Sequence, residues 1–282
     1  MNALPKSEIK AITKLLKTND ESTTSLLKEQ LKTFDIKLLK EIEAEIPKGD
    51  DSLREGFLSL ITEIKREKLK EEFSRWSGNK LSTLEEGIFL IALFNNPLID
   101  TENYSKILDK WSLELKQHLE KVKVPGDVTS IVNEINHFLF MELGFKGNKK
   151  DYYDPSNSFI DVVIDQKSGN PILLSIIYML VTNKIGLPIK GVNMPAHFLV
   201  QYLDTFEPIY VDPFGQGEIV TREVCKDRIK SLKLEWQESY LTAPTDKQII
   251  LRVMQNLINI YNDTGQVDLK ECLESYIKAL KT

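Results

Sequence analysis

Hydrophobic residues in most of this 282-residue chain recur every three or four positions, which is the spacing of amphipathic helices. Three short helices are predicted within residues 1–46. A break at 47–50 then precedes a longer helix that Asp51 or Ser52 could cap. Short helices joined by tight turns are typical of a HEAT-like pair and also of a generic helical bundle, and the sequence leaves both open.

The middle of the chain has a different pattern. Residues 172–185 are apolar on nearly every side, which predicts a helix buried in the domain centre. Asn170 can cap its free N–H groups, and Pro171 suits the first helical position. Three short β-rich runs separated by turn residues follow, at 189–193, 197–203 and 209–212. They predict a small antiparallel sheet, and therefore an α+β fold that is predominantly α-helical.

Helical patterns flank this middle region on both sides. Residues 81–119 are mostly helical, and 128–143 predict another helix that Gly144 would end. Two tail helices, at 247–261 and 269–280, resemble one tetratricopeptide-type hairpin, which must dock on the centre because it cannot bury its own apolar face. We therefore predict three parts: a helical module, a core with its leading helices, and a helical hairpin. Their ranges are 1–75, 76–245 and 246–282.

Composition and charge narrow the function. The chain has 37 basic and 42 acidic side chains, a net charge of −5, so nucleic acid is not expected as a partner. No apolar stretch approaches the roughly 20 residues that span a bilayer, and the first residues lack the order of a signal peptide. Cys225 and Cys272 are too few for a disulfide framework or a thiolate zinc site. These features predict a soluble, cytoplasmic protein without membrane contact.

The three histidines are scattered along the chain, with no HExxH or CxxC spacing, so we expect no metal site and no cofactor. His118 is expected on a solvated helix face and His137 as a hydrogen-bonded core residue. Cys225 and Cys272 are expected to pack as small hydrophobes.

His197 carries the clearest candidate chemistry, together with Asp212. His197 begins one predicted strand and Asp212 ends the next. If Leu199 pairs with Asp212, the two side chains share a face as diagonal neighbours, whereas a one-residue slip would separate them. Such a pair forms the second and third members of a nucleophile–His–Asp triad. A thiolate would be favoured at the start of the buried helix, but Asn170 and Pro171 occupy that position.

The order of segments between residues 130 and 225 is distinctive: LGFKGN at 143–148, YDPSNS at 153–158, GNPILLS at 169–175, PAHF at 195–198 and DPF at 212–214. Together they resemble the SirB1 family of transglutaminase-like proteins, in which a tetratricopeptide-like ending is common. The resemblance implies a papain-like transglutaminase core, with a central helix packed on an antiparallel sheet. By that analogy His197 and Asp212 match the family's histidine and aspartate, and Asn170 or Pro171 stands where an active transglutaminase has its cysteine. The family usually has glycine at the position of Ala196.

Five further side chains could line a cleft around this pair: Tyr153, Asn157, Ser158, Asn170 and Ser175. Each also has a structural interpretation. Asn and Ser side chains commonly satisfy turn backbone, and a helical serine commonly bonds a preceding carbonyl. The His197–Asp212 pair can equally be a relict that orders the sheet.

Two functions remain. The first is a non-catalytic pseudoenzyme that binds a peptide or protein segment, or acts as a scaffold, through the degenerate cleft around His197. The alternative is an amide or ester hydrolase, or an acyltransferase-like enzyme, in which the His197–Asp212 pair activates water or Ser175. The missing nucleophile favours the first.

Overall fold

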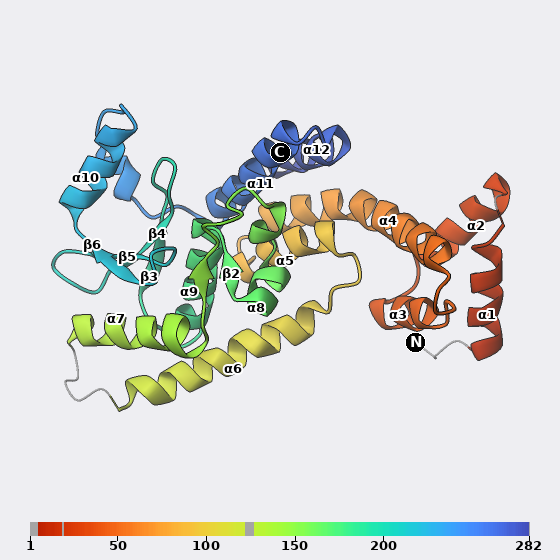
Figure 1. Cartoon of the computed structure of the whole chain (residues 1–282), viewed down its shortest axis with the longest axis horizontal. Coiled ribbons are helices and arrows are strands. Elements are labelled where there is room, and N and C mark those ends of the chain that lie inside the picture. Colours follow the sequence, from red (N-terminus) through yellow and green to blue (C-terminus); the bar gives the residue numbers. More distant parts are fainter. Residues whose placement is uncertain (1–4, 19, 122–126, 282) are drawn as a thin grey trace.

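Helices dominate the computed structural model, which describes residues 5–18, 20–121 and 127–281 (Figure 1). The α-helices are α1 (Lys6–Leu15), α2 (Glu21–Leu31), α3 (Ile36–Ala44), α4 (Asp51–Gly78), α5 (Leu84–Asn95), α6 (Thr101–Leu119), α7 (Val128–Asn136), α8 (Ile160–Gln166), α9 (Pro171–Asn183), α10 (Arg222–Ser231), α11 (Asp246–Asp263) and α12 (Val267–Lys281). The strands are β1 (Lys146–Gly147), β2 (Ser168–Gly169), β3 (Ile189–Val192), β4 (Leu199–Tyr202), β5 (Ile209–Asp212) and β6 (Glu218–Val220). This is the predominantly helical α+β fold that the sequence predicts.

Helix α4 extends from the group of α1, α2 and α3 toward the rest of the molecule (Figure 1), and it contributes side chains to two separate apolar cores. Its first half packs with α1, α2 and α3 through residues such as Phe57 and Ile61, and its second half enters the main core through Phe73. The side chain of Asp50 caps α4 by accepting from the Leu53 N–H, so the cap lies one residue before the two positions considered from the sequence. The predicted boundary at residue 75 lies within α4, and the three-part division stays a prediction.

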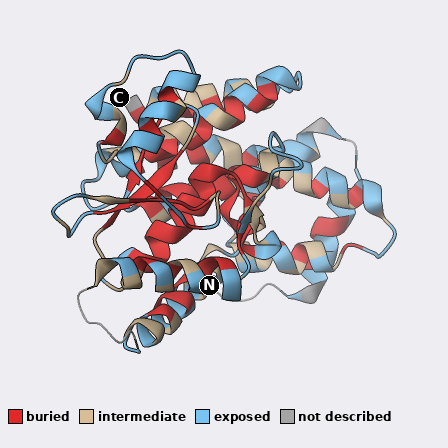
Figure 2. Cartoon of the chain, turned by 60° about the vertical axis from the view of Figure 1, so that its left-hand side comes forward, coloured by how far each residue is buried: buried red, intermediate tan, exposed pale blue. Residues whose placement is uncertain are grey.

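Helix α9 is the buried centre of the fold, as predicted. Every residue from Pro171 to Thr182 is buried, so the helix appears red along its length in Figure 2. Asn170 caps it by accepting from the Leu173 N–H at 3.0 Å, and Pro171 occupies the first turn, where it costs no hydrogen bond.

The main sheet packs against α9 and has the antiparallel order β3–β4–β5–β6. Val200 pairs with Val211, which sets Leu199 opposite Asp212, the register that the sequence analysis required. Strand β6 was not predicted, and neither was the short parallel pair of β1 and β2, because runs of two or three residues carry no periodicity. Strand β4 begins at Leu199 rather than at His197, since a turn at Ala196 (φ 58°) precedes it.

The predicted helix over 128–143 is divided. Helix α7 ends at Asn136 and continues as the π-helical turn η1 (His137–Glu142), after which Gly144 adopts a φ of +77°. The sequence analysis placed His137 in the core, and this prediction is wrong. The His137 side chain is half-exposed, and its Nε2 lies 3.2 Å from the Glu142 carboxylate. The reason is that His137 falls on the outer face of this turn, whereas Phe138 points into the core.

The two tail helices form an antiparallel hairpin that docks on the rest of the molecule, as predicted. Helix α11 buries Ile250 and Met254 in the main core, and α12 lies along α4. The Tyr276 hydroxyl of α12 donates to the carbonyl oxygen of Arg66 at 3.0 Å. The hairpin therefore contacts both the core and the long helix.

Candidate functional site

The structure brings His197 and Asp212 together. Nε2 of His197 lies 2.9 Å from Oδ2 of Asp212, because the register of β4 and β5 places the turn before β4 beside the end of β5. Asp212 is buried, whereas the His197 side chain keeps 19% of its surface exposed. A carboxylate at this distance fixes the orientation of the imidazole and leaves its second nitrogen available.

Three further donors hold the Asp212 carboxylate. Oδ2 accepts from Nη1 of Arg228 at 2.9 Å, and Oδ1 accepts from the backbone N–H groups of Phe214 and Gly215, each at 3.1 Å. Burial works against ionisation of this carboxyl, but the hydrogen bonds from His197, Arg228 and Gly215 outweigh it and hold the pKa of Asp212 below its usual value. The carboxylate is therefore charged at neutral pH.

Asn170 occupies the helix start that faces His197. Its Oδ1 accepts from the Leu173 N–H at 3.0 Å, and its Nδ2 donates to Oγ of Ser158 at 2.9 Å. Both ends of the amide are thus engaged in holding backbone and loop, and neither is nucleophilic. Pro171, beside it, offers no reactive group.

A cleft of about 270 Å³ opens between His197 and the tail helix α11. Thirteen residues line it: Tyr152, Tyr153, Asn170, Pro171, Ile172, Ala196, His197, Phe198, Arg252, Asn256, Asn259, Ile260 and Asp263. No cysteine, serine or threonine stands among these lining residues. The cleft therefore combines an oriented imidazole with aromatic, amide and apolar surfaces, and lacks a conventional nucleophile.

Of the predicted cleft residues, Tyr153 and Asn170 line the cleft, whereas Asn157, Ser158 and Ser175 do not. Asn157 is buried and donates to the carbonyl oxygens of Asp151 (2.7 Å) and Tyr152 (3.2 Å), so it shapes the turn that presents the tyrosines. Ser158 is buried beneath Asn170.

Ser175 is fully buried on α9, and its hydroxyl donates to the Phe198 carbonyl at 3.4 Å. Because α9 is apolar on all sides, a serine one turn beyond its start is enclosed by the sheet rather than open to the cleft. Its hydroxyl ties the helix to the segment that carries His197.

Tyr152 and Tyr153 form the outer wall of the cleft. Their rings meet edge to face with centroids 5.1 Å apart, and Tyr152 also meets Phe214 edge-on at 5.7 Å. Tyr153 is 76% exposed, although its aromatic ring is apolar. Burial, with a smaller contribution from Tyr153, raises the pKa of Tyr152, which therefore stays neutral.

Helix α11 supplies the opposite wall, which the sequence analysis missed. Arg252, Asn256, Asn259 and Asp263 recur at i, i+4, i+7 and i+11 and so form one polar row on a helix whose other face is buried. Nη1 of Arg252 donates to Asn193 Oδ1 and to the Met194 carbonyl (2.8 Å), and Nη2 donates to the His197 carbonyl (3.3 Å). The regular spacing of these polar residues was the available signal.

The remaining candidates lie elsewhere. Cys225 is fully buried on α10, where burial raises the pKa of its thiol, so it packs as a hydrophobe, as predicted. Cys272, on α12, packs against the main core, as predicted, and is partly exposed. His118 is partly buried, with Nδ1 3.0 Å from the Glu134 carboxylate. Within the ranges that the structure describes, no cluster of His, Cys, Asp and Glu side chains is arranged to hold a metal ion.

Comparison with known proteins places this site in context. The family model described as "Transglutaminase-like superfamily" matches residues 102–255, more than half of the chain. No solved structure matches the chain significantly. Over the described part of the chain, none of the helices combines the length and hydropathy needed to cross a membrane.

Several relatives are similar to parts of the chain. A UPF0162 protein of Xylella fastidiosa is 29% identical over 197 residues, which cover 67% of this chain and 69% of that protein. F-box only protein 21 of Mus musculus is 36% identical over 167 residues, which cover 53% of this chain and 25% of that protein. A UPF0162 protein of Vibrio cholerae is 37% identical over 84 residues, 29% of this chain and 31% of its own length.

Proposed function

Because the chain belongs to the transglutaminase-like superfamily, we propose that it is a SirB1-type member without the catalytic cysteine, whose cleft binds a peptide or protein segment without cleaving it. The observation that carries this proposal is the state of Asn170. It stands at the helix start facing His197, and both ends of its amide are engaged by Leu173 and Ser158. A site with an oriented imidazole and no nucleophile retains recognition but not acyl transfer.

The surfaces of the cleft suit a polypeptide. Tyr153 offers an exposed aromatic ring, which buries a large area at little cost in conformational entropy. Opposite it, the Asn256 amide carries both a donor and an acceptor, and within the described parts of the chain no hydrogen bond engages it. A peptide main chain presents the complementary groups.

The setting of the cleft also favours scaffolding. In this proposal the hairpin of α11 and α12 is tetratricopeptide-like and contributes one wall of the binding site, so the tail and the core act as one recognition unit. We assign the protein to the cytoplasm, where Cys225 and Cys272, both unpaired in the structure, would stay reduced.

Selection of peptides from a random dodecapeptide phage library tests peptide binding. Peptides enriched on the wild-type protein, measured by fluorescence anisotropy, should bind Tyr153→Ala and Asn256→Ala at least about tenfold more weakly, roughly 1.4 kcal/mol each. Phe206→Ala is the matched control, because Phe206 is an aromatic residue even more exposed than Tyr153 and lies on the β4–β5 loop, outside the cleft. No enrichment, or equal binding by all these variants, would contradict the proposal.

The His197–Asp212 contact favours one alternative, an amide or ester hydrolase. His197 lines the cleft and is oriented by Asp212, so its second nitrogen could activate a water molecule. Ser175 is a poor nucleophile for this route, since its hydroxyl is fully buried and bonded to Phe198.

Hydrolysis of p-nitrophenyl acetate distinguishes the two functions. A hydrolase would lose about 100-fold or more of its rate in His197→Ala and keep its rate in Ser175→Ala. His137→Gln is the control, because an exposed imidazole such as that of His137 hydrolyses activated esters without a built site. Equal small losses in the His197 and His137 variants would leave binding as the function.

A further inference from the structure

The α11 wall of the His197 cleft has a charged residue at each end. Arg252 lies at the end next to His197, and Asp263 lies at the other end. The amides of Asn256 and Asn259 lie between them. Asp263 follows Arg252 by eleven residues, a distance of about 16 Å along the helix axis. Because an extended chain covers about 3.3 Å per residue, the wall can contact about five residues of a bound peptide.

The positive charge of this wall is already engaged by groups of the chain itself. The Arg252 guanidinium donates to the Asn193 side chain and to the backbone carbonyl oxygens of Met194 and His197. Three oxygen atoms therefore accept its hydrogen bonds before any ligand enters the cleft. Arg252 holds the turn that carries His197, and we do not expect it to select a ligand by charge.

The negative end of the wall has no comparable partner. Among the thirteen described residues that line the cleft, Asp263 is the only one with a carboxylate. Asp263 is exposed, and within the ranges that the structure describes it takes part in no ion pair. Its Oδ1 accepts a long hydrogen bond, 3.4 Å, from the adjacent Asn262 amide. Nζ of Lys270 donates to Asn262 at 2.9 Å rather than to Asp263. The Asp263 carboxylate is therefore free to pair with a ligand.

The end of helix α11 adds negative charge at the same place. Asp263 is the last residue of this 18-residue helix. The C-terminal end of a helix carries roughly half a negative charge, which Lys or Arg side chains in the last turn commonly balance. The last turn of α11 contains no basic residue. The carboxylate and the helix dipole therefore both favour a cation from outside α11.

The apolar surface beside Asp263 suits a long basic side chain. Ile260 precedes Asp263 by three residues, so the two side chains lie on the same face of α11, and both line the cleft. The methylene groups of a lysine or arginine can pack on Ile260 while the charged group reaches the carboxylate. Tyr153, on the opposite wall, is 76% exposed, and its ring can bind the same cation through its π face.

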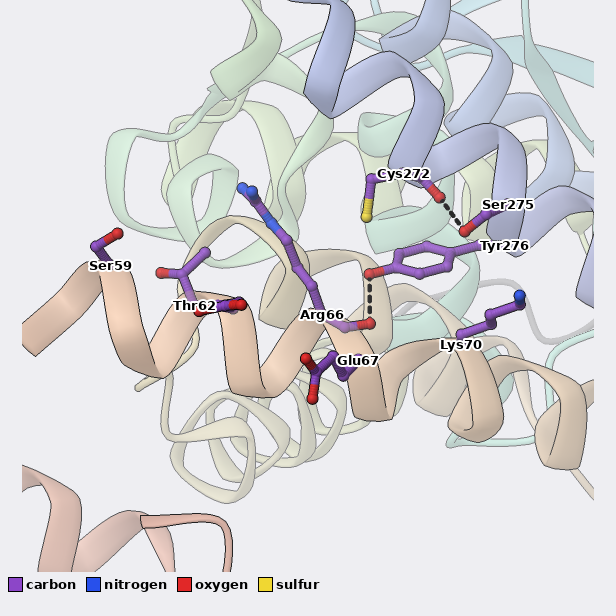
Figure 3. A pocket seen from close by; sticks show the side chains of 9 residues that line it. Ser59, Thr62, Arg66, Glu67, Lys70, Cys272, Ser275 and Tyr276 are labelled. Atoms are coloured by element: carbon purple, nitrogen blue, oxygen red, sulfur yellow. Dashed lines mark hydrogen bonds between the residues drawn. The ribbon is translucent and has the colours of Figure 1, made fainter. Parts of the chain in front are cut away.

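A larger groove, of about 540 Å³, lies between α4 and α12 (Figure 3) and does not offer an equivalent site. Its two carboxylates, Glu63 and Glu67, each have an oxygen 2.8 Å from Nζ of Lys28. Arg66 and Lys70 line the same groove and would repel a cation. A basic side chain therefore has a free carboxylate to pair with in the His197 cleft but not in this groove.

We propose that the Asp263 end of the cleft binds the side chain of a lysine or arginine in the bound segment. This assignment rests on the proposed function, because it names the residue type that the same cleft recognises. Ion pairs of exposed carboxylates contribute little energy. Asp263 therefore selects among peptides, whereas the apolar and amide surfaces of the cleft supply most of the affinity.

Parallel phage selections on the wild-type protein, Asp263→Asn and Asp268→Asn test this assignment. Asp268 is exposed in the first turn of α12 and does not line the cleft, so its replacement changes the net charge equally. Peptides selected by the wild-type protein and by Asp268→Asn should share a lysine or arginine at one position. Peptides selected by Asp263→Asn should lack that preference.

Fluorescence anisotropy with one selected peptide separates charge from shape. Replacing its shared lysine with norleucine, or its shared arginine with citrulline, removes the charge and keeps the stem. Asp263→Asn should bind the original peptide at least about threefold more weakly than the wild-type protein or Asp268→Asn. All three proteins should bind the neutral peptide equally. The threefold difference should shrink between about 0.1 M and 1 M NaCl, because salt screens exposed charges.

The outcomes distinguish this proposal from the proposed function. If no peptide is selected, or if Tyr153→Ala and Asn256→Ala bind selected peptides as the wild type does, the proposed function fails and the basic-residue site fails with it. Peptides that depend on Tyr153 and Asn256 but share no basic residue, or that bind Asp263→Asn as tightly as the wild type, overturn the basic-residue site alone. Thermal melts exclude misfolding. If Asp263→Asn does not fold, the neutral peptide provides the test, since it should bind the wild-type protein at least about threefold more weakly than the original.

Discussion

Arg252, on the tail helix α11, donates a hydrogen bond to the backbone carbonyl of His197, which lies 55 residues earlier in the chain. The same guanidinium also bonds the Met194 carbonyl and the Asn193 side chain. One residue of the tail therefore holds the whole turn that presents His197 to the cleft. Burial lowers the pKa of Arg252, but a guanidinium keeps its proton, so these bonds are charge-assisted.

Replacing Arg252 with alanine should therefore loosen the His197 turn. We expect a loss of about 2–3 kcal/mol of unfolding free energy, because the carbonyl oxygens of Met194 and His197 lose a charged donor. Amide hydrogen exchange at 194–198 should accelerate more than in α9. Arg75→Ala, on an exposed arginine, is the control for loss of charge. Unchanged exchange in the turn would show that the sheet alone positions His197.

Replacing Ala196 with glycine should stabilise the protein. Its φ of 58° lies in the left-handed region, which costs a residue with a Cβ about 1–2 kcal/mol. Ala196→Gly removes this strain but gains freedom in the unfolded chain, so we expect a net stabilisation of up to about 1 kcal/mol in urea unfolding. Ala196→Val should destabilise the fold, because a β-branched residue tolerates positive φ poorly. A loss of stability in the glycine variant would contradict this interpretation of the turn.

Asp212→Asn should lower the free energy of unfolding by an amount that depends on pH. At pH 7 the change leaves His197 and Arg228 without their charged acceptor, and we expect a loss of roughly 3 kcal/mol. The folded-state pKa of Asp212 is lowered, so the wild-type advantage is fully present above the unfolded carboxyl pKa of about 3.9. It is lost as the pH falls through the lower folded value.

Urea unfolding of both proteins at several pH values measures this difference. The gap between wild type and Asp212→Asn should be present at both pH 7 and pH 5, and should narrow below about pH 4. A gap that stays constant to pH 3 would mean that the carboxylate contributes through shape rather than charge. Glu235→Gln is the control, because it also replaces a carboxylate with an amide but does so on an exposed residue.

Much of the core was predictable because strong local signals agreed with the fold. The apolar run after Asn170 predicted a buried helix, and the β-rich runs predicted the antiparallel sheet. Their register stayed conditional in the sequence, and the pairing of Val200 with Val211 in the structure is what brings His197 to Asp212. Helix caps were less certain, since Asp50, Asp51 and Ser52 are all good capping residues in succession and only the chain geometry selects Asp50.

The rest of the site depends on contacts between distant segments, which periodicity does not encode. The cleft wall on α11 could not be predicted without knowing which side of the tail hairpin docks on the core. Ser175 was placed near the cleft by sequence distance from Asn170, but one helical turn carries it beneath the sheet. Asn157 and Ser158 support the loop from below because their side chains bond backbone and Asn170 rather than solvent.

Gly147 should tolerate no side chain, because an added Cβ would lie 2.6 Å from the Phe214 ring and 2.8 Å from the Phe214 carbonyl. The Phe214 ring packs edge-on to His197, so moving it disturbs the site as well as the fold. We expect Gly147→Ala to cost about 1–3 kcal/mol of unfolding free energy and to shift the His197 imidazole resonances in NMR spectra. Gly56→Ala is the matched control, since that glycine lies inside α4 with open space around it, and alanine there should stabilise the helix by about 0.5–1 kcal/mol. If both substitutions stabilise the protein, Phe214 can move away from β1 without strain, and the close contact does not hold the cleft in shape.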